Sequence, residues 1–189
     1  MLNRLELKKL RGFYMKHLYI AIAFIIIVAM FIFLRKDLFK EKKQKVMEIS
    51  EINGIYYKYN AARGWSYSIE IKKEESNYFL NAIFDDPENS YKPIDLIWES
   101  EEYAQTIKMF FDRIIEVFDN NDVLSWDGFD GHDPRALDGW GFDLRIDFGN
   151  GSQLIAKGEN SFPKGYSEVR KEFYDLINEI IRIYHDSEK

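Results

Sequence analysis

The stretch WGFDLRIDFGNGSQLIAK, residues 140–157, carries the strongest structural pattern in the chain. Apolar and polar side chains alternate through residues 140–148, which is the period of a strand with one buried face. Asn150 and Gly151 predict a two-residue type I′ turn, because both residue types accept positive φ. With that turn, Ile155 would lie opposite Ile146 on the buried face. The stretch therefore predicts an antiparallel hairpin that covers one side of a core.

The same alternation recurs upstream, in residues 65–72, WSYSIEIK. The turn sequence EESN follows, and YFLNAIF at 78–84 then returns, which predicts a second hairpin. GIYYKYN at 54–60 and IDLIW at 94–98 have the composition of further short strands. Strands joined by short turns favour an antiparallel sheet.

Two amphipathic helices accompany these strands. One begins after Ser100, and its apolar residues recur at spacings of three and four as far as Phe118. The other begins at Ser167 and keeps the same spacing as far as Tyr184. Helices with a single apolar stripe pack that stripe on one face of a sheet. We therefore expect a small α+β domain over residues 54–186, with an antiparallel sheet and both helices on one face.

Residues 18–34 read LYIAIAFIIIVAMFIFL and hold no charged side chain. As a helix they would reach roughly 26 Å, and flanking basic side chains can snorkel to complete a span. A buried core helix is disfavoured because β-branched and aromatic residues cover every face of this run and both of its flanks are strongly basic. A cleaved signal peptide would precede small residues, whereas LRKDLFK follows here. We expect one transmembrane helix, an uncleaved signal-anchor, between a basic tail (1–17) and a juxtamembrane helix or stalk (35–53). Asn53 and Gly54 would end that stalk.

Charge is divided sharply along the chain. Residues 1–45 hold 11 Lys and Arg against 3 Asp and Glu, a net charge of +8. The totals of 26 and 32 leave 15 basic and 29 acidic residues for 46–189, a net charge of −14. An acidic body repels nucleic-acid phosphates, so we expect no nucleic-acid partner. The basic end suits anionic lipid headgroups, and the expected partner of residues 18–34 is the lipid bilayer of the cell membrane.

The flanking charges are nearly balanced across the predicted span, with five basic residues before it and six after it. A short tail with five positive charges is costly to translocate, which favours a cytoplasmic tail and an extracytoplasmic body. A body in the cytoplasm is the alternative.

The chain has no cysteine, which excludes a disulfide framework, thiol catalysis, a cysteine zinc site and a lipid-modified cysteine. The sequence also lacks serine-nucleophile motifs, phosphate-binding loops and dinucleotide fingerprints. A pair of carboxylates acting as acid and base is the catalytic route that stays open. No cofactor is predicted.

Residues 126–139, WDGFDGHDPRALDG, combine four aspartates with a histidine. A calcium loop beginning at Asp127 would need oxygen ligands at its third and fifth positions, where Phe129 and Gly131 stand. A zinc site would need histidines besides His132, and the other two are far away in the sequence. We predict no metal and interpret the stretch as a polar loop whose aspartates bond to their own backbone. Its candidate ligand-binding residues are Asp127, Asp130, His132 and Asp133.

One longer pattern joins Asp138-Gly139, F-x-L-x-I at 142–146 and G-x-N-x-F-P at 158–163, ahead of the last helix. It resembles a poorly characterised group of bacterial domains that are anchored to membranes as lipoproteins or by one helix. The resemblance implies an exported body and a strand–turn–strand–helix order, and it implies no activity. This chain departs from the lipoprotein members in lacking a cysteine, so its anchor would be the helix. Asn160 and Tyr166 are further candidate ligand-binding residues.

These observations favour a membrane-anchored protein whose acidic domain binds a protein, an envelope component or a ligand at the membrane surface, without catalysis. One alternative is a cell-envelope hydrolase that uses acidic residues of 127–138, with or without a divalent cation. Another is a regulatory or immunity-type protein on the cytoplasmic face. The sequence leaves the three functions open.

Overall fold

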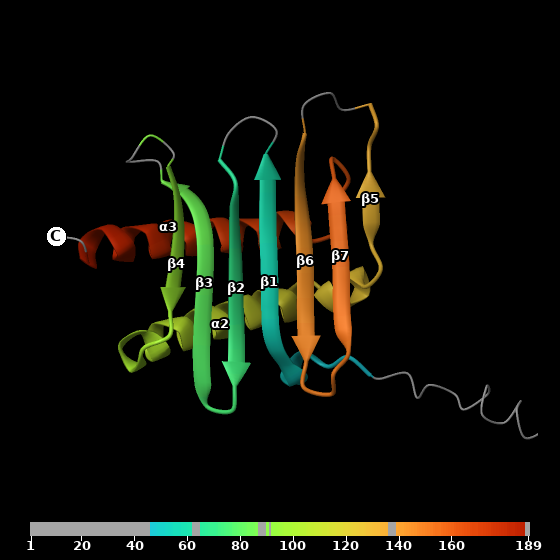
Figure 1. Ribbon diagram of the computed structural model, residues 1–189. Coiled ribbons are helices and arrows are strands. Elements are labelled where there is room, and N and C mark those ends of the chain that lie inside the picture. The colour runs from blue at the N-terminus through green and yellow to red at the C-terminus, as the bar shows by residue number, and fades with distance from the viewer. Residues whose placement is uncertain (1–45, 62–64, 87–89, 91, 136–138, 188–189) are drawn as a thin grey trace, which may run out of the picture. The chain divides into compact units, whose positions relative to one another are not determined.

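Figure 1 shows the computed structural model, which describes residues 46–61, 65–86, 90, 92–135 and 139–187. Its elements are η1 (Ile49–Glu51), β1 (Ile52–Ala61), β2 (Tyr67–Glu74), β3 (Asn77–Asp86), β4 (Lys92–Trp98), α2 (Glu101–Asn120), η2 (Val123–Trp126), β5 (Asp130–His132), β6 (Trp140–Phe148), β7 (Gln153–Glu159) and α3 (Tyr166–Ser187). They belong to one compact unit, Val46–Lys189. The basic tail and the transmembrane helix predicted at 18–34 lie outside the described residues. Within the described residues, no helix is long and apolar enough to cross a membrane.

Seven strands form one sheet in the order β4-β3-β2-β1-β6-β7-β5. Six of them pair antiparallel, as the hairpin patterns predict. β5 runs parallel to β7 at the edge of the sheet. The predicted polar loop is therefore wrong at Asp130–His132. The sequence DGH has little strand propensity of its own, and pairing with the edge of β7 overrides that local preference.

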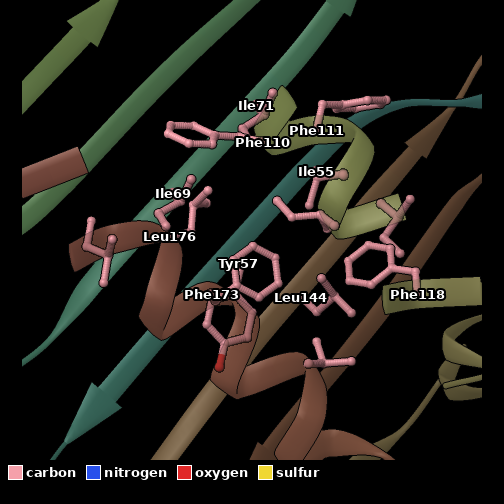
Figure 2. Packing of buried hydrophobic residues seen from close by; sticks show 14 of the residues in the cluster. Ile55, Tyr57, Ile69, Ile71, Phe110, Phe111, Phe118, Leu144, Phe173 and Leu176 are labelled. Atoms are coloured by element: carbon pink, nitrogen blue, oxygen red, sulfur yellow. The ribbon is translucent and has the colours of Figure 1, made fainter. Parts of the chain in front are cut away.

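Both helices lie behind the sheet in Figure 1, and the predicted α+β class is confirmed. Apolar side chains of β1, β2, β6 and the helices meet between the two layers (Figure 2). The ring of Tyr57 in β1 stacks on that of Phe173 in α3, with centroids 4.0 Å apart. Arg113 of α2 joins the helices to each other, because its guanidinium contacts Glu172 at 2.7 Å and Glu179 at 2.9 Å in α3. The helix layer is thus fixed both to the sheet and within itself.

The turn between β6 and β7 is longer than the predicted two-residue turn. The N–H of Gly151 donates to the carbonyl of Phe148 at 2.8 Å, and the N–H of Phe148 donates to the carbonyl of Ser152 at 3.1 Å. Gly151 has a φ of 75°, while Asn150 does not have a positive φ. This is a type I turn followed by a glycine bulge, so the predicted type I′ turn is wrong.

The additional loop residue moves the strand register by one position. Leu154 lies opposite Ile146 and is fully buried, whereas Ile155 lies opposite Arg145 and is 55% exposed. Because side chains alternate between faces, a shift of one residue exchanges the two sides of β7. The prediction that Ile155 is a core residue is therefore wrong.

The juxtamembrane segment predicted over 35–53 as a helix or stalk is not a continuous helix in the part that the structure describes, residues 46–53. Residues 46–48 have no regular structure, η1 is a single turn, and β1 begins at Ile52. Gly54, expected to end the stalk, lies inside β1, where an added Cβ would be 3.0 Å from the Asp147 carboxylate on β6. Pairing of β1 with β6 and burial of Ile52 override a locally helix-permissive sequence.

We name the side of the sheet toward the viewer in Figure 1 the open face, because no described helix lies on it. Its exposure is clearest in β7, where Leu154 and Ala156 are buried and Ile155 and Lys157 are exposed. An antiparallel sheet commonly keeps one solvated face of this kind. Among the described residues, no helix covers the hollows of this face.

Candidate functional site

A groove of about 610 Å³ lies on the open face, where β1, β5 and β7 end and β6 begins. We name it the glycine groove, because Gly141 stands at its centre. Asn60, Gly141, Glu159 and His132 follow one another across these four strands as register partners. The missing side chain at Gly141 leaves a gap between Asn60 and Glu159. The groove has the size of a small-ligand site.

Glycine is required at position 141 by the close approach of the next strand. A Cβ there would lie 2.8 Å from the carbonyl oxygen of Gly158 on β7. Such a contact with backbone cannot be relieved by rotating a side chain, so the strands would have to separate. The local packing of β6 and β7 therefore produces the gap that forms the groove.

A second row of register partners beside Gly141 alternates in charge: Lys58, Asp143, Lys157 and Asp130. The ammonium group of Lys157 contacts the carboxylate of Asp130 at 3.2 Å. Asp143 makes no ion pair within 4.0 Å among the described residues. Burial and, next, the negative charge of Asp143 raise the pKa of the Tyr56 hydroxyl above its ordinary value. Asp143 is thus a carboxylate whose charge is not neutralised by direct contact.

His132 and Glu159 form the outer wall of the groove. Nδ1 of His132 lies 3.1 Å from Oε2 of Glu159, and the two side chains are 55% and 66% exposed. Such an exposed pair contributes little to stability. Both side chains can therefore rearrange around a ligand at low cost.

The six candidate residues of the sequence analysis are only partly brought together. Asp130, His132 and Asn160 line the glycine groove. Asp127 lies apart from them and accepts the N–H of Ile155 at 3.3 Å. Asp133 also turns away, and its hydrogen bonds with Arg135 hold the pKa of its carboxyl below its ordinary value.

The acidic residues of the 126–139 stretch therefore do not converge on one point. Within the described ranges, no three His, Asp or Glu side chains are placed to bind one metal ion. Asp138, the last aspartate of the stretch, lies outside the described residues. The groove instead draws its charged side chains from three separate strands, β5, β6 and β7.

Asn160 and Tyr166 occupy structural positions. Asn160 has a φ of 55°, its side-chain oxygen accepts the N–H of Trp140 at 3.1 Å, and its own N–H donates to the Trp140 carbonyl. It therefore holds the start of β6 against the end of β7. Tyr166 is 3% exposed and stacks on Phe162 with ring centroids 4.6 Å apart. Its hydroxyl points into the core, toward Tyr57.

Five groove residues were not predicted from the sequence: Asn60, Gly141, Asp143, Lys157 and Glu159. One signal for them exists in the sequence. Gly141 interrupts an otherwise regular strand pattern, and an isolated glycine in a strand marks a bulge or a close approach of backbone or ligand. The other four residues appear as ordinary polar positions of strands, because strand pairing alone brings them together.

No protein-family model, curated protein or solved structure matches the chain. The resemblance of residues 138–163 to membrane-anchored bacterial domains therefore stays a prediction. The chemistry of the glycine groove has to follow from its own residues.

Proposed function

We propose that this chain is a single-pass membrane-anchored protein whose domain binds a cationic ligand in the glycine groove, without chemical conversion. The observation that carries the proposal is the gap at Gly141, which opens directly beside the unpaired carboxylate of Asp143. A ligand cation placed in the gap would give this carboxylate a direct counter-ion. The anchor is the uncharged run at 18–34.

The preference for a cation follows from the charges that line the groove. Asp130, Asp143 and Glu159 carry three negative charges, and Lys157 carries one positive charge. The body around them has a net charge of −14 over residues 46–189. Negative walls and a negative body both raise the local concentration of cations and repel anions.

Reversible binding suits the solvation of this site better than acid–base catalysis does. The side chains of Asp130, His132, Lys157 and Glu159 are all more than half exposed to water. Catalytic acids and bases are typically tuned by burial that shifts their pKa. Open, hydrated side chains instead favour exchange of a ligand with solvent.

The groove lies at the end of the sheet away from the point where the chain enters the domain. Val46 lies beside the β6–β7 turn, where its carbonyl accepts a hydrogen bond from the Asn150 amide at 2.8 Å. β1 then runs for 10 residues, about 33 Å at ~3.3 Å per residue, and ends at the groove. A domain tethered through Val46 would therefore keep its ligand site clear of its own attachment point.

The binding proposal is tested by calorimetric titration of the full-length protein in phosphatidylcholine nanodiscs. Spermidine is the cationic probe and citrate the anionic control. We expect spermidine to bind and citrate not to bind. Asp143→Asn should weaken spermidine binding about fivefold or more, because it removes the nearest unpaired carboxylate.

A steric variant supplies an independent arm of the same experiment. Asn60→Tyr should lay an aromatic ring over Gly141 and block the groove without loss of stability. Asp119→Asn, on the exposed side of α2, makes the same charge change as Asp143→Asn far from the groove. Equal losses in Asp119→Asn and Asp143→Asn, or no binding of spermidine at all, would refute a cation site in the groove.

The membrane anchor needs its own test. We expect the full-length chain to stay in the membrane pellet after extraction with alkaline carbonate, because a spanning helix is held by the hydrocarbon core. A reporter fused after Lys189 should be active only outside the cytoplasm. Release of the chain by carbonate would rule out the anchor and leave the groove proposal standing.

A further inference from the structure

The other end of the open face has a different chemistry. Ile83 on β3 and Ile97 on β4 are 45% and 58% exposed. Asn81 is the register partner of Ile97, and Ile83 is that of Asp95, so the two isoleucines are diagonal neighbours on the open face. Phe79 lies on the same side of β3, two residues before Asn81. We name Phe79, Ile83 and Ile97 the β3–β4 patch.

A hollow of about 380 Å³ lies beside this patch, and Phe79, Asn81 and Ile97 line it. The side-chain oxygen of Asn81 is buried there and has no hydrogen-bond partner among the described residues. A buried polar atom without a partner is costly in a folded protein. The hollow therefore combines exposed apolar surface with an incompletely satisfied amide.

The rim of the hollow is acidic. Glu70 is neutralised by Arg145 at 3.0 Å and by Lys72 at 3.1 Å. Glu74 and Glu99 also line the hollow, and both are exposed without an ion pair within the described ranges. Asp95, beside Ile83, is likewise exposed without one. Three uncompensated carboxylates therefore surround the apolar patch.

We propose that the β3–β4 patch is a docking surface for a basic, amphipathic segment of a partner protein. Its apolar side chains would cover Ile83 and Ile97, and its lysines or arginines would reach Glu74, Asp95 and Glu99. Buried apolar anchors with a charged rim are the usual composition of a protein interface. Long basic side chains fit both parts, because their stems are apolar and their ends are charged.

Charge favours a basic protein segment over two other occupants, an anionic lipid surface and a second copy of this chain. Anionic lipid headgroups would be repelled by the acidic rim. In a second copy of this chain, the same patch would bring like carboxylates together, which is unfavourable. Among the described strands, β4 is moreover at an edge of the sheet, and an extended partner segment would pair with its outer side.

The surface is independent of the glycine groove, because none of its residues lines that groove. Binding is measured by fluorescence anisotropy on the full-length protein in phosphatidylcholine nanodiscs, with empty nanodiscs as the blank. The probe is a labelled heptapeptide of alternating lysine and leucine, and its counterpart replaces each lysine by glutamate. We expect the basic peptide to bind, the acidic peptide not to bind, and affinity to fall with added salt.

Two variants locate the binding, each with a matched control. Ile97→Ser and Glu99→Gln should each weaken the basic peptide about fivefold or more, because they remove an anchor and a rim charge. Met109→Ser and Glu102→Gln make equivalent changes on exposed positions of α2 and should change affinity less than about twofold. All four side chains are exposed, so the variants are expected to keep their thermal stability.

The alternative outcomes are distinct. Equal losses in the patch variants and the α2 controls would show diffuse attraction to an acidic protein and would overturn the proposal. Loss in Asp143→Asn with no change in Ile97→Ser would place the peptide in the glycine groove and would also overturn it. Failure of the basic peptide to bind would overturn it as well. Failure of the basic peptide to bind would leave the spermidine titration of the groove as a separate test.

Discussion

The hydroxyl oxygens of Tyr57 and Tyr166 lie 3.0 Å apart in the layer between the sheet and α3, where neither side chain is more than 3% exposed. One residue belongs to the central strand β1 and the other begins α3, 109 positions later. Their hydrogen bond satisfies two polar groups that water does not reach. It therefore fixes the first turn of α3 over the centre of the sheet.

Replacing either tyrosine by phenylalanine should destabilise the domain by about 1–3 kcal/mol, because the remaining hydroxyl loses its buried partner. Tyr57→Phe combined with Tyr166→Phe should cost less than the sum of the two single changes, since no unpaired hydroxyl is left. Urea denaturation measures the three values. Tyr174→Phe, 47% exposed on α3, is the control and should have an effect within about 0.5 kcal/mol. Additive single and double changes would show that the two hydroxyls are not coupled.

The domain should lose stability steeply in alkaline solution. Burial raises the pKa values of the Tyr57, Tyr67 and Tyr166 hydroxyls above the ordinary value of 10.0. Above pH 10 the unfolded chain releases these protons while the folded chain retains them. The free energy of unfolding therefore falls by about 1.4 kcal/mol per pH unit for each tyrosine above pH 10. Below that pH these three tyrosines do not change it.

Tyrosinate absorbance and circular dichroism, recorded together during an alkaline titration, test this prediction. The ionisation of the buried tyrosines should coincide with the loss of secondary structure. In Tyr67→Phe the free energy of unfolding should fall less steeply above pH 10, by the contribution of one tyrosine, about 1.4 kcal/mol per pH unit. Ionisation of all tyrosines near pH 10, while the secondary structure is still intact, would contradict the burial of Tyr57, Tyr67 and Tyr166.

The register of β7 buries Leu154 and exposes Ile155, so the two side chains contribute unequally to stability. Leu154→Ala should cost about 2–5 kcal/mol, because it leaves a cavity beneath the helix layer. Ile155→Ala should change stability by no more than about 0.5 kcal/mol, because its side chain is on the open face. Thermal or urea unfolding of the two variants provides the comparison. A larger effect at Ile155 would instead support the two-residue turn expected from Asn150 and Gly151.

Asn160 should matter for folding rather than for ligand binding. Asn160→Ala removes the acceptor of the Trp140 N–H and places an alanine at a φ of 55°, so we expect a loss of about 1–3 kcal/mol. Asn160→Asp keeps an acceptor oxygen and should lose much less. Melting temperature and spermidine affinity are measured on the same samples. An Asn160→Ala variant with normal stability but no spermidine binding would assign Asn160 to the ligand site.

The regular elements were predictable where one local pattern acts alone. Alternation identified β6, and its bounds agree with the predicted 140–148. Apolar spacings of three and four identified α2 and α3, whose buried residues include Ile107, Phe118 and Phe173. These patterns succeed because the side chains that reach the core are chosen by the geometry of the element itself.

Predictions failed where pairing between distant segments competes with local preference. Residues 46–53 are helix-permissive, yet β1 already begins at Ile52, where pairing with β6 starts. Asp130–His132 looked like part of a loop, and β7 makes them a strand. In the β6–β7 turn, Asn150 and Gly151 fit two turn types, and burial of Leu154 agrees with the register of the longer loop.

The sequence by itself determined the α+β class, one buried side for each long strand and helix, and the division between a basic apolar end and an acidic body. Tertiary structure alone decided the strand order, the parallel edge strand and both hollows of the open face. The reason is physical: periodicity along the chain shows which side chains turn inward. The neighbours of a polar residue across a sheet depend instead on strands that are far apart in sequence. Asn60, Gly141 and Glu159 adjoin only because β1, β6 and β7 pair in one register.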